Sequence, residues 1–167
     1  MKFLEDCLAE QGYKIERLEG NLHSGGDATI ETFWPDRDVQ ESDDLSDNNR
    51  SLVSLIEFAG IRILLCSDIE EYAQREILRL HPDLQADVVV VPHHGSAGTR
   101  DETFLESLNA EVLICSCDQK QYERTTSDIG QMADLSNQVK TFYTARDGAI
   151  MVTVHKNGSI ETTAFQK

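Results

Sequence analysis

Two adjacent histidines follow a strongly apolar run near the middle of the chain. Residues 87–91 read Asp-Val-Val-Val-Val, and residues 92–96 read Pro-His-His-Gly-Ser. A β-branched run that is apolar on both faces is typical of a buried parallel strand, and α/β proteins place their sites at the carboxyl ends of such strands. Neutral imidazole is a preferred zinc ligand. His93 and His94 are therefore candidate metal ligands, and a solvated turn is the alternative.

A carboxylate and a hydroxyl are candidates for the same site. Asp68 follows the apolar run 61–66 and precedes an acidic segment that is predicted to be helical, so its carboxylate projects from a rigid strand end. Asp directly before a helix also commonly accepts backbone N–H bonds, so capping is the alternative role of Asp68. Ser96 is a candidate substrate-binding residue because its hydroxyl can bind a phosphate, and stabilisation of the turn is its alternative role.

Alternating strands and helices are expected to position these side chains. The patterns predict strands at 13–18, 28–34, 51–58, 61–66, 88–91, 112–117, 139–143, 148–154 and 159–164, and helices at 3–11, 70–80, 100–108 and from Thr126 or Ser127 to about 137. Turns at Ala59-Gly60 and Asn157-Gly158 predict two β-hairpins. A run of strands followed by alternating strands and helices predicts an α/β sandwich with a mixed sheet.

Side-chain patterns add detail to these elements. The residues expected to face the core from helix 70–80 and strand 28–34 are Ile77, Leu78, Leu80 and either Phe33 or Trp34. Thr99 or Asp101 is expected to cap helix 100–108. Residues 36–50 are rich in Asp and Glu and lack an apolar period, so they are expected to form a mobile acidic loop.

Composition indicates a single acidic domain. The 167 residues include 30 acidic and 15 basic side chains, which gives a net charge of −15. That charge argues against a broad surface that grips nucleic acid through its phosphates. No apolar run is long enough to span a bilayer, and the first residues lack the apolar centre of a signal peptide. The chain is therefore expected to be soluble and cytoplasmic.

The four cysteines show no disulfide framework. Cys66, Cys115 and Cys117 all fall in apolar, strand-like runs, and Cys-x-Cys on a strand would place both sulfurs on one face of the sheet. Buried thiols are favoured over a metal or redox role.

Three ordered motifs carry a family resemblance. Residues 48–53 read Asn-Asn-Arg-Ser-Leu-Val, residues 64–70 read Leu-Leu-Cys-Ser-Asp-Ile-Glu, and residues 86–96 read Ala-Asp-Val-Val-Val-Val-Pro-His-His-Gly-Ser. In this order and at this spacing they resemble the metallo-β-lactamase-fold domain of the ComEC/Rec2 competence proteins, which take up DNA. The resemblance covers most of the chain, from about Leu4 to Ile160, and implies a metallo-β-lactamase-like αββα sandwich.

The resemblance also implies a chemistry for the candidate site. An aspartate at the position of Asp68 bridges two metal ions in the family, and one of His93 and His94 corresponds to the last ligand. Zinc or manganese is the implied metal, phosphodiester hydrolysis the implied reaction and DNA the implied partner. Many related enzymes carry a further His ligand near Asp47, for which a solvated loop acid is the alternative. Family members are often fused to a membrane channel, which implies an extracytoplasmic location if the chain is part of a larger membrane protein.

The sequence departs from the family pattern in three places. The His-x-His-x-Asp-His cluster, which supplies most of the ligands, does not occur among the 167 residues, and three of the five histidines are isolated. Cys66-Ser67 replaces the usual Thr-Gly before the aspartate. Residues 121–124, Gln-Tyr-Glu-Arg, stand where the family has Tyr-Gly-His-Pro.

These departures lead to three hypotheses for the whole chain. The first is that residues 1–167 are the carboxyl-terminal part of a ComEC/Rec2-like domain with a partial metal site, inactive in hydrolysis unless a missing amino-terminal half completes it. The second is a degenerate, non-catalytic binding or assembly module that covers its open sheet face as a homodimer. The third is a mononuclear metal binder that uses Asp68, His93 and His94.

Overall fold

A computed structural model describes residues 7–13, 22–23, 26–36, 39, 44–127 and 139–166. Within these ranges the strands are β1 (Leu22–His23), β2 (Thr29–Trp34), β3 (Val53–Phe58), β4 (Ile61–Leu65), β5 (Val88–Val90), β6 (Val112–Cys115), β7 (Lys140–Tyr143), β8 (Ala149–Val154) and β9 (Ile160–Phe165). The α-helices are α3 (Glu71–Leu80), α4 (Glu102–Ser107), α5 (Gln119–Ser127) and α6 (Thr144–Asp147), and short 3₁₀ helices span Asn48–Arg50, Pro92–Gly95 and Ala97–Thr99.

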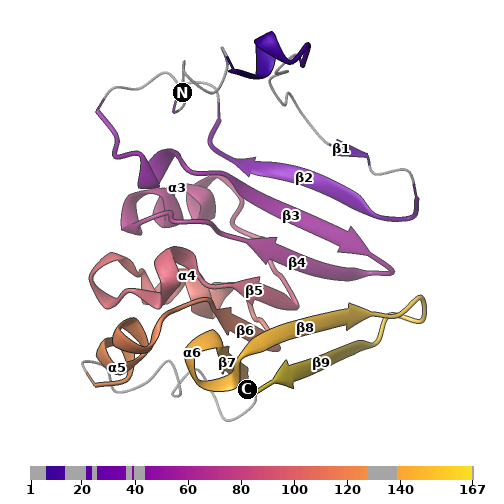
Figure 1. Ribbon diagram of the computed structural model, residues 1–167, viewed down its shortest axis with the longest axis vertical. Coiled ribbons are helices and arrows are strands. Elements are labelled where there is room, and N and C mark those ends of the chain that lie inside the picture. Colours follow the sequence, from indigo (N-terminus) through magenta and orange to yellow (C-terminus); the bar gives the residue numbers. More distant parts are fainter. Residues whose placement is uncertain are drawn as a thin grey trace.

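The main sheet is mixed. Its order is β1-β2-β3-β4-β5-β6-β7, and the strands follow one another across it as they do along the chain (Figure 1). Strands β1 to β4 pair antiparallel, whereas β4 to β7 pair parallel. The parallel half requires a crossover between successive strands, which α3, α4 and the segment with α5 provide. The predicted α/β class with a mixed sheet is confirmed.

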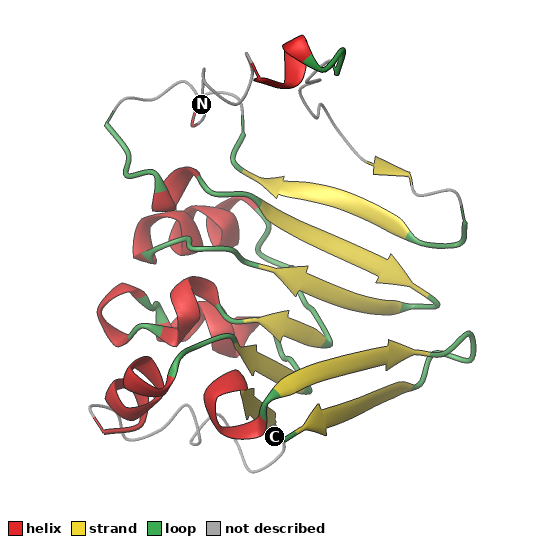
Figure 2. Ribbon diagram, viewed as in Figure 1, coloured by secondary structure: helices red, strands yellow, loops and turns green. Residues whose placement is uncertain are grey.

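One apolar row crosses the centre of this sheet and organises the core. Leu55 pairs with Leu64, Leu64 with Val89, and Val89 with Leu113, so the four side chains lie on one face. Helices flank the sheet along one side in Figure 2. The members of the same core cluster in α3 and α4 are Ala73, Ile77, Phe104 and Leu105, and Leu108 joins them directly after α4. Burial of each such leucine side chain stabilises the fold by about 1.5–3 kcal/mol.

A second, two-stranded sheet consists of the hairpin β8–β9. Gly148 begins it with a φ of 76°, and a Cβ at this position would overlap the carbonyl oxygen of Phe165. Glycine is therefore required here both by the backbone angle and by the close approach of β9. The hairpin turn contains Gly158, as Asn157-Gly158 predicted.

Burial agrees with the prediction at Trp34 and Ile77 and differs from it at Leu80. Trp34 is fully buried, and its indole Nε1–H donates to the carbonyl oxygen of Asn49 at 2.7 Å. Ile77 is fully buried as expected, but Leu80 at the end of α3 is 41% exposed. The prediction for Leu80 was wrong because α3 instead turns Ala73 and Gln74 toward the core.

The helix at the end of the parallel half begins earlier than predicted. Thr126 or Ser127 was expected to start a helix, but α5 spans Gln119–Ser127 and both residues lie at its end. Asp118 precedes α5, and its Oδ1 accepts a hydrogen bond from the backbone N–H of Gln121 at 2.7 Å. The preceding strand correspondingly ends at Cys115 rather than at 117. Residues 128–138 lie outside the described part of the chain.

Some expected elements fall on residues that the structure does not describe. Most of strand 13–18 and the first part of helix 3–11 are among them, although residues 7–10 are helical. The acidic loop 36–50 is described in part, and its mobility stays a prediction. Within 44–50 the chain forms the 3₁₀ helix Asn48–Arg50 and buries Asn49.

Candidate functional site

Four neighbouring parallel strands bring the candidate residues to one edge of the sheet. Asp68 follows β4, the histidines follow β5, Ser116 and Cys117 follow β6, and Thr144 follows β7. Because these strands are parallel neighbours, their carboxyl ends meet at the same edge. The predicted placement of Asp68 beside the histidine pair is therefore a direct consequence of sheet topology.

Two backbone turns at this edge have unusual angles. Ser67, His93 and His94 have φ values of 49°, 46° and 57°. Positive φ in a residue other than glycine costs about 1–2 kcal/mol, and it persists only where the surroundings hold it in place. Here the N–H of His93 donates to the carbonyl oxygen of Ser67 at 3.0 Å, which joins the two turns. Ser67 thus occupies a left-handed position where the resembled family has glycine.

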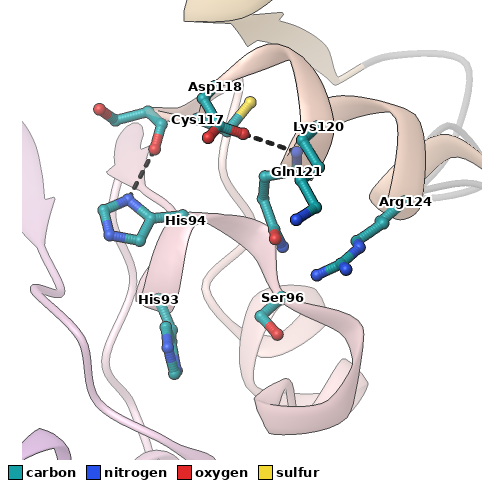
Figure 3. Close-up of a pocket in the computed structure, with 9 residues that line it drawn as sticks. His93, His94, Ser96, Cys117, Asp118, Lys120, Gln121 and Arg124 are labelled. Carbon is teal, nitrogen blue, oxygen red and sulfur yellow. Dashed lines mark hydrogen bonds between the residues drawn. The ribbon is translucent and has the colours of Figure 1, made fainter.

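His94 is held in an orientation that suits a ligand. Its Nδ1 lies 2.7 Å from the carbonyl oxygen of Ser116 (Figure 3). A carbonyl oxygen only accepts, so Nδ1 carries the hydrogen and neutral His94 presents an unprotonated Nε2. That Nε2 lies 3.5 Å from Oδ1 of Asp68. Two acceptors therefore face one another across a gap that a cation or a proton can fill.

The thiol after β6 supports the backbone of the same histidine. Cys115 Sγ donates to the carbonyl oxygen of His94 at 3.0 Å. Burial, with the neighbouring Cys117 thiol adding to it, raises the pKa of Cys115 well above the ordinary range, and burial raises the pKa of Cys66 in the same direction. Both thiols stay protonated, which makes them poor metal ligands. All four cysteines are free; Cys66 and Cys115 are buried as predicted, whereas Cys117 is half-buried.

His93 faces a different carboxylate. Its Nδ1 is buried without a hydrogen-bond partner and lies 3.8 Å from Oε1 of Glu70. Glu70 itself accepts hydrogen bonds from Ser46 Oγ, Asn48 Nδ2 and Asn49 Nδ2 at 3.0–3.2 Å. Glu70 was not among the predicted site residues. Its position two residues after Asp68, on the same turn, was the signal that could have identified it.

Asn49 performs the capping role that was considered for Asp68. Its Oδ1 accepts from the backbone N–H groups of Glu70 and Ala73 at 3.1 and 3.2 Å, at the start of α3. The backbone N–H of Asp68 donates to Ser51 Oγ at 3.2 Å. Because Asn49 caps α3 from a distant segment, the carboxylate of Asp68 is not needed for that role.

A pocket of about 600 Å³ opens beside the histidines. It is lined by His93, His94, Ser96, Ser116, Cys117, Asp118, Lys120, Gln121 and Arg124 (Figure 3). Ser96 is among these lining residues, and its backbone N–H donates to the carbonyl oxygen of His93; its role in substrate binding stays a prediction. The residues from α5 were not predicted. Asp118 three positions before Gln121 is a capping pattern that could have placed them.

The geometry of Asp68 and His94 fits two ligands of one metal ion, but the described residues do not supply a complete ligand set. Zinc held tetrahedrally places its nitrogen and oxygen ligands about 3.4 Å apart, and the Nε2–Oδ1 separation of His94 and Asp68 is 3.5 Å. In the described ranges, however, no group of three or more His, Cys, Asp or Glu residues is placed to hold a metal ion. The ring centroid of His93 lies 6.3 Å from that of His94, and His93 faces Glu70 instead of Asp68.

Comparison with known proteins gives two sequence relatives. The chain is 28% identical over 143 residues, 84% of its length, to ComE operon protein 3 of Bacillus subtilis (strain 168). The chain is thus similar, over most of its length, to a ComEC/Rec2-like protein. It is also 32% identical over 125 residues, 74% of its length, to the uncharacterised protein YcaI of Escherichia coli (strain K12). The expected resemblance to the ComEC/Rec2 proteins is confirmed.

The matches cover only part of the relatives. This chain spans 18% and 15% of their lengths, and no family model matches it. Among solved structures, a metallo-β-lactamase superfamily protein from Thermotoga maritima superposes on 77% of this chain and 70% of its own, with a TM-score of 0.44 and 16% identity. None of the helices in the described part of the chain has the length and apolar character required to cross a bilayer.

Proposed function

We propose that this chain contributes Asp68 and His94 to a metal-dependent phosphodiesterase site. One observation carries the proposal: Nε2 of His94 and Oδ1 of Asp68 face each other at 3.5 Å while Nδ1 of His94 is bonded to a backbone carbonyl. Metal-bound histidines characteristically donate their second ring N–H in this way, which fixes the tautomer and the ring orientation. His94 rather than His93 is the ligand in this proposal.

The protein residues have separable tasks in such a site. Asp68 and His94 hold a zinc or manganese ion, which when bound lowers the pKa of a water molecule and polarises a phosphoryl oxygen. His93 and Ser96 line the adjacent pocket and face the substrate. The ligands beyond these two come from outside the described residues, because a hydrolytic centre commonly needs three or more from protein. Because the 167 residues also lack the His-x-His-x-Asp-His cluster that supplies most ligands in the resembled family, the chain alone is expected to bind metal weakly and to hydrolyse poorly.

Isothermal titration calorimetry with ZnCl₂ and MnCl₂ tests the proposed pair. Asp68→Asn is expected to weaken metal binding at least tenfold, because a neutral amide replaces the anionic ligand. Asp47→Asn is the matched control: it removes the same charge from a side chain that is 96% exposed and pairs with Arg50. Equal affinity of the wild-type chain and Asp68→Asn would contradict the proposal.

DNA is the proposed substrate, and uptake of DNA the proposed context, because the chain is similar over 84% of its length to a ComEC/Rec2-like protein. Hydrolysis of bis(p-nitrophenyl) phosphate with Mn²⁺ tests whether the chain is inactive alone. No release of p-nitrophenolate is expected. Release that disappears in the His94→Ala variant would show that the site is complete within these residues. The cellular compartment stays a prediction.

A second candidate function is a non-catalytic assembly module that self-associates. The incomplete donor set favours it, as does the two-stranded sheet β8–β9, on which Met151 and Phe165 are 49% and 51% exposed. Static light scattering separates the two functions. A dimer that persists on dilution, together with no metal binding, favours the module, whereas a monomer that binds zinc favours the hydrolase.

A further inference from the structure

Helix α5 presents polar side chains to the pocket from one face. Lys120, Gln121 and Arg124 all line it. Positions 120 and 124 are one helical turn apart, so both cationic side chains project from the same side of the helix. Figure 3 shows the polar ends of Gln121 and Arg124 directed toward the side of the pocket where Ser96 lies.

The lining of this pocket favours an anion. Among the nine described residues that form it, Asp118 is the one whose side chain only accepts hydrogen bonds. Its Oδ1 already accepts from the backbone N–H of Gln121 at 2.7 Å. The other lining side chains are hydroxyls, a thiol, imidazoles, an amide, an ammonium and a guanidinium, all of which can donate. The phosphate of a phosphodiester offers only acceptors at neutral pH and complements such a surface.

The charge of the pocket contrasts with the charge of the whole chain. In the pocket, Lys120 and Arg124 supply two positive charges and Asp118 one negative charge. The whole chain, in contrast, has a net charge of −15. A cationic wall on an acidic molecule confines anion binding to this place, because the remaining surface repels polyanions. The volume of about 600 Å³ is within the usual range for small-molecule pockets and accommodates a nucleotide-sized group.

We propose that Lys120 and Arg124, with Gln121 and Ser96, form a phosphate-binding subsite for a phosphodiester beside the reactive site. This inference rests on the proposed function for the identity of the ligand, but the subsite itself needs no metal ion. No Phe, Tyr or Trp is among the described lining residues, so bases have no stacking surface there. Binding is therefore independent of base sequence, since contacts to phosphate carry no sequence information.

Fluorescence anisotropy in EDTA tests the subsite without the metal. The probe is a fluorescein-labelled oligothymidylate of about ten nucleotides, a length within the site size of a single-strand binding domain. The double variant Lys120→Ala/Arg124→Ala is expected to bind at least tenfold more weakly. Lys140→Ala/Lys156→Ala is the matched control, because it removes the same charge from two exposed lysines that do not line the pocket.

Salt and inorganic phosphate identify the chemistry that is recognised. Two phosphate contacts to a single strand predict that a rise from 50 to 200 mM salt weakens binding about sevenfold. Inorganic phosphate is expected to displace the probe, and oligoadenylate to bind as well as oligothymidylate. The inference is overturned if the wild-type chain does not bind the probe, if phosphate does not compete, or if the control variant loses as much affinity as the pocket variant.

The same experiments separate this inference from the proposed function. A pocket variant that loses the oligonucleotide but keeps the metal affinity of the wild-type chain supports the subsite. A wild-type chain that binds metal through Asp68 and ignores the oligonucleotide in EDTA overturns the subsite and leaves the proposed hydrolase standing. Oligonucleotide binding without any metal affinity supports the subsite and contradicts the proposed hydrolase.

Discussion

The two sides of the candidate site are built differently. One side, here called the anchored wall, consists of residues 46–51 with Glu70, and its side chains are tied to one another and to α3 by hydrogen bonds. The other side, the α5 wall, consists of Lys120, Gln121 and Arg124, of which Lys120 and Arg124 are exposed. The comparison indicates a division of labour: the anchored wall fixes the turns that carry Asp68 and His93, and the α5 wall meets the ligand.

Loss of the cap in the anchored wall has the largest expected effect. Asn49→Ala removes the acceptor for two backbone N–H groups at the start of α3 and the Nδ2 donor to Glu70. Unsatisfied buried groups and a lost cap together predict a decrease of about 3 kcal/mol in the free energy of unfolding. Urea denaturation monitored by circular dichroism measures it. In the same segment, Asp47→Ala breaks only an exposed ion pair with Arg50 and should leave the midpoint unchanged.

Helix α6 contains a carboxylate, that of Asp147, whose contribution to the stability of the fold depends on pH. Asp147 accepts two hydrogen bonds from Arg146 at 2.7 Å and one from the N–H of Tyr143 at 2.9 Å. The Arg146 guanidinium lowers the pKa of Asp147 below its ordinary 3.8, against the opposing effect of burial. A carboxylate with a lowered pKa stabilises the fold above its ordinary pKa, and that stabilisation is lost as the pH falls through the lowered value.

Asp147→Asn is therefore expected to cost about 1–2 kcal/mol at pH 7 and progressively less below pH 4. Thermal unfolding of both proteins between pH 7 and pH 3 measures the difference. A constant difference across that range would contradict the assignment. The α5 wall should be affected with the core, because Thr144 Oγ1 on the same helix bonds both the N–H and the carbonyl oxygen of Cys117.

A smaller effect concerns the strained turn between the two walls. Ser67 has a φ of 49° and donates its hydroxyl to the carbonyl oxygen of Leu52 at 2.6 Å. Ser67→Ala loses the hydrogen bond and keeps the strain, whereas Ser67→Gly loses both. The glycine variant should be more stable than the alanine variant by about 1 kcal/mol. Chemical denaturation of the pair tests this, and an alanine variant that equals or exceeds glycine would refute the strain at this turn.

The smallest effect on stability is expected at the α5 wall. Lys120→Ala/Arg124→Ala should change the free energy of unfolding by less than about 0.5 kcal/mol, because both side chains are exposed. A differential scanning calorimetry scan of the variant measures this beside its ligand binding. A loss of stability comparable to that of Asn49→Ala would show that the α5 wall contributes as much to the stability of the fold as the anchored wall does.

The sheet was predictable from sequence because its strands are strongly patterned. The hairpin β3–β4 across Ala59-Gly60, the buried strand β5 and the hairpin β8–β9 lie within two residues of their predicted ranges. Parallel order then brings the ends of β4 and β5 together, so the proximity of Asp68 and His94 was also predictable. Asp101 caps α4 by accepting from the N–H of Phe104, as one of two proposed alternatives.

The rest of the site depends on contacts that periodicity does not encode. Glu70 and Asn49 meet across 21 residues of sequence, and a short run of polar residues gives no pattern for that pairing. The start of α5 was missed because its residues are mostly polar and lack an apolar stripe, so the weaker capping pattern at Asp118 was the available signal. The two histidines could not be distinguished until Ser116 was placed beside His94.

Metal affinity of the two single-histidine variants tests the central claim most directly. Zinc titrations of His94→Ala and His93→Ala, at one pH and with thermal stability checked for both, form a matched pair from adjacent residues. The structure predicts that His94→Ala loses most of the zinc affinity of the wild-type chain and that His93→Ala retains it, because only His94 faces Asp68 at 3.5 Å. Loss in His93→Ala with retention in His94→Ala would contradict the assignment of the ligand.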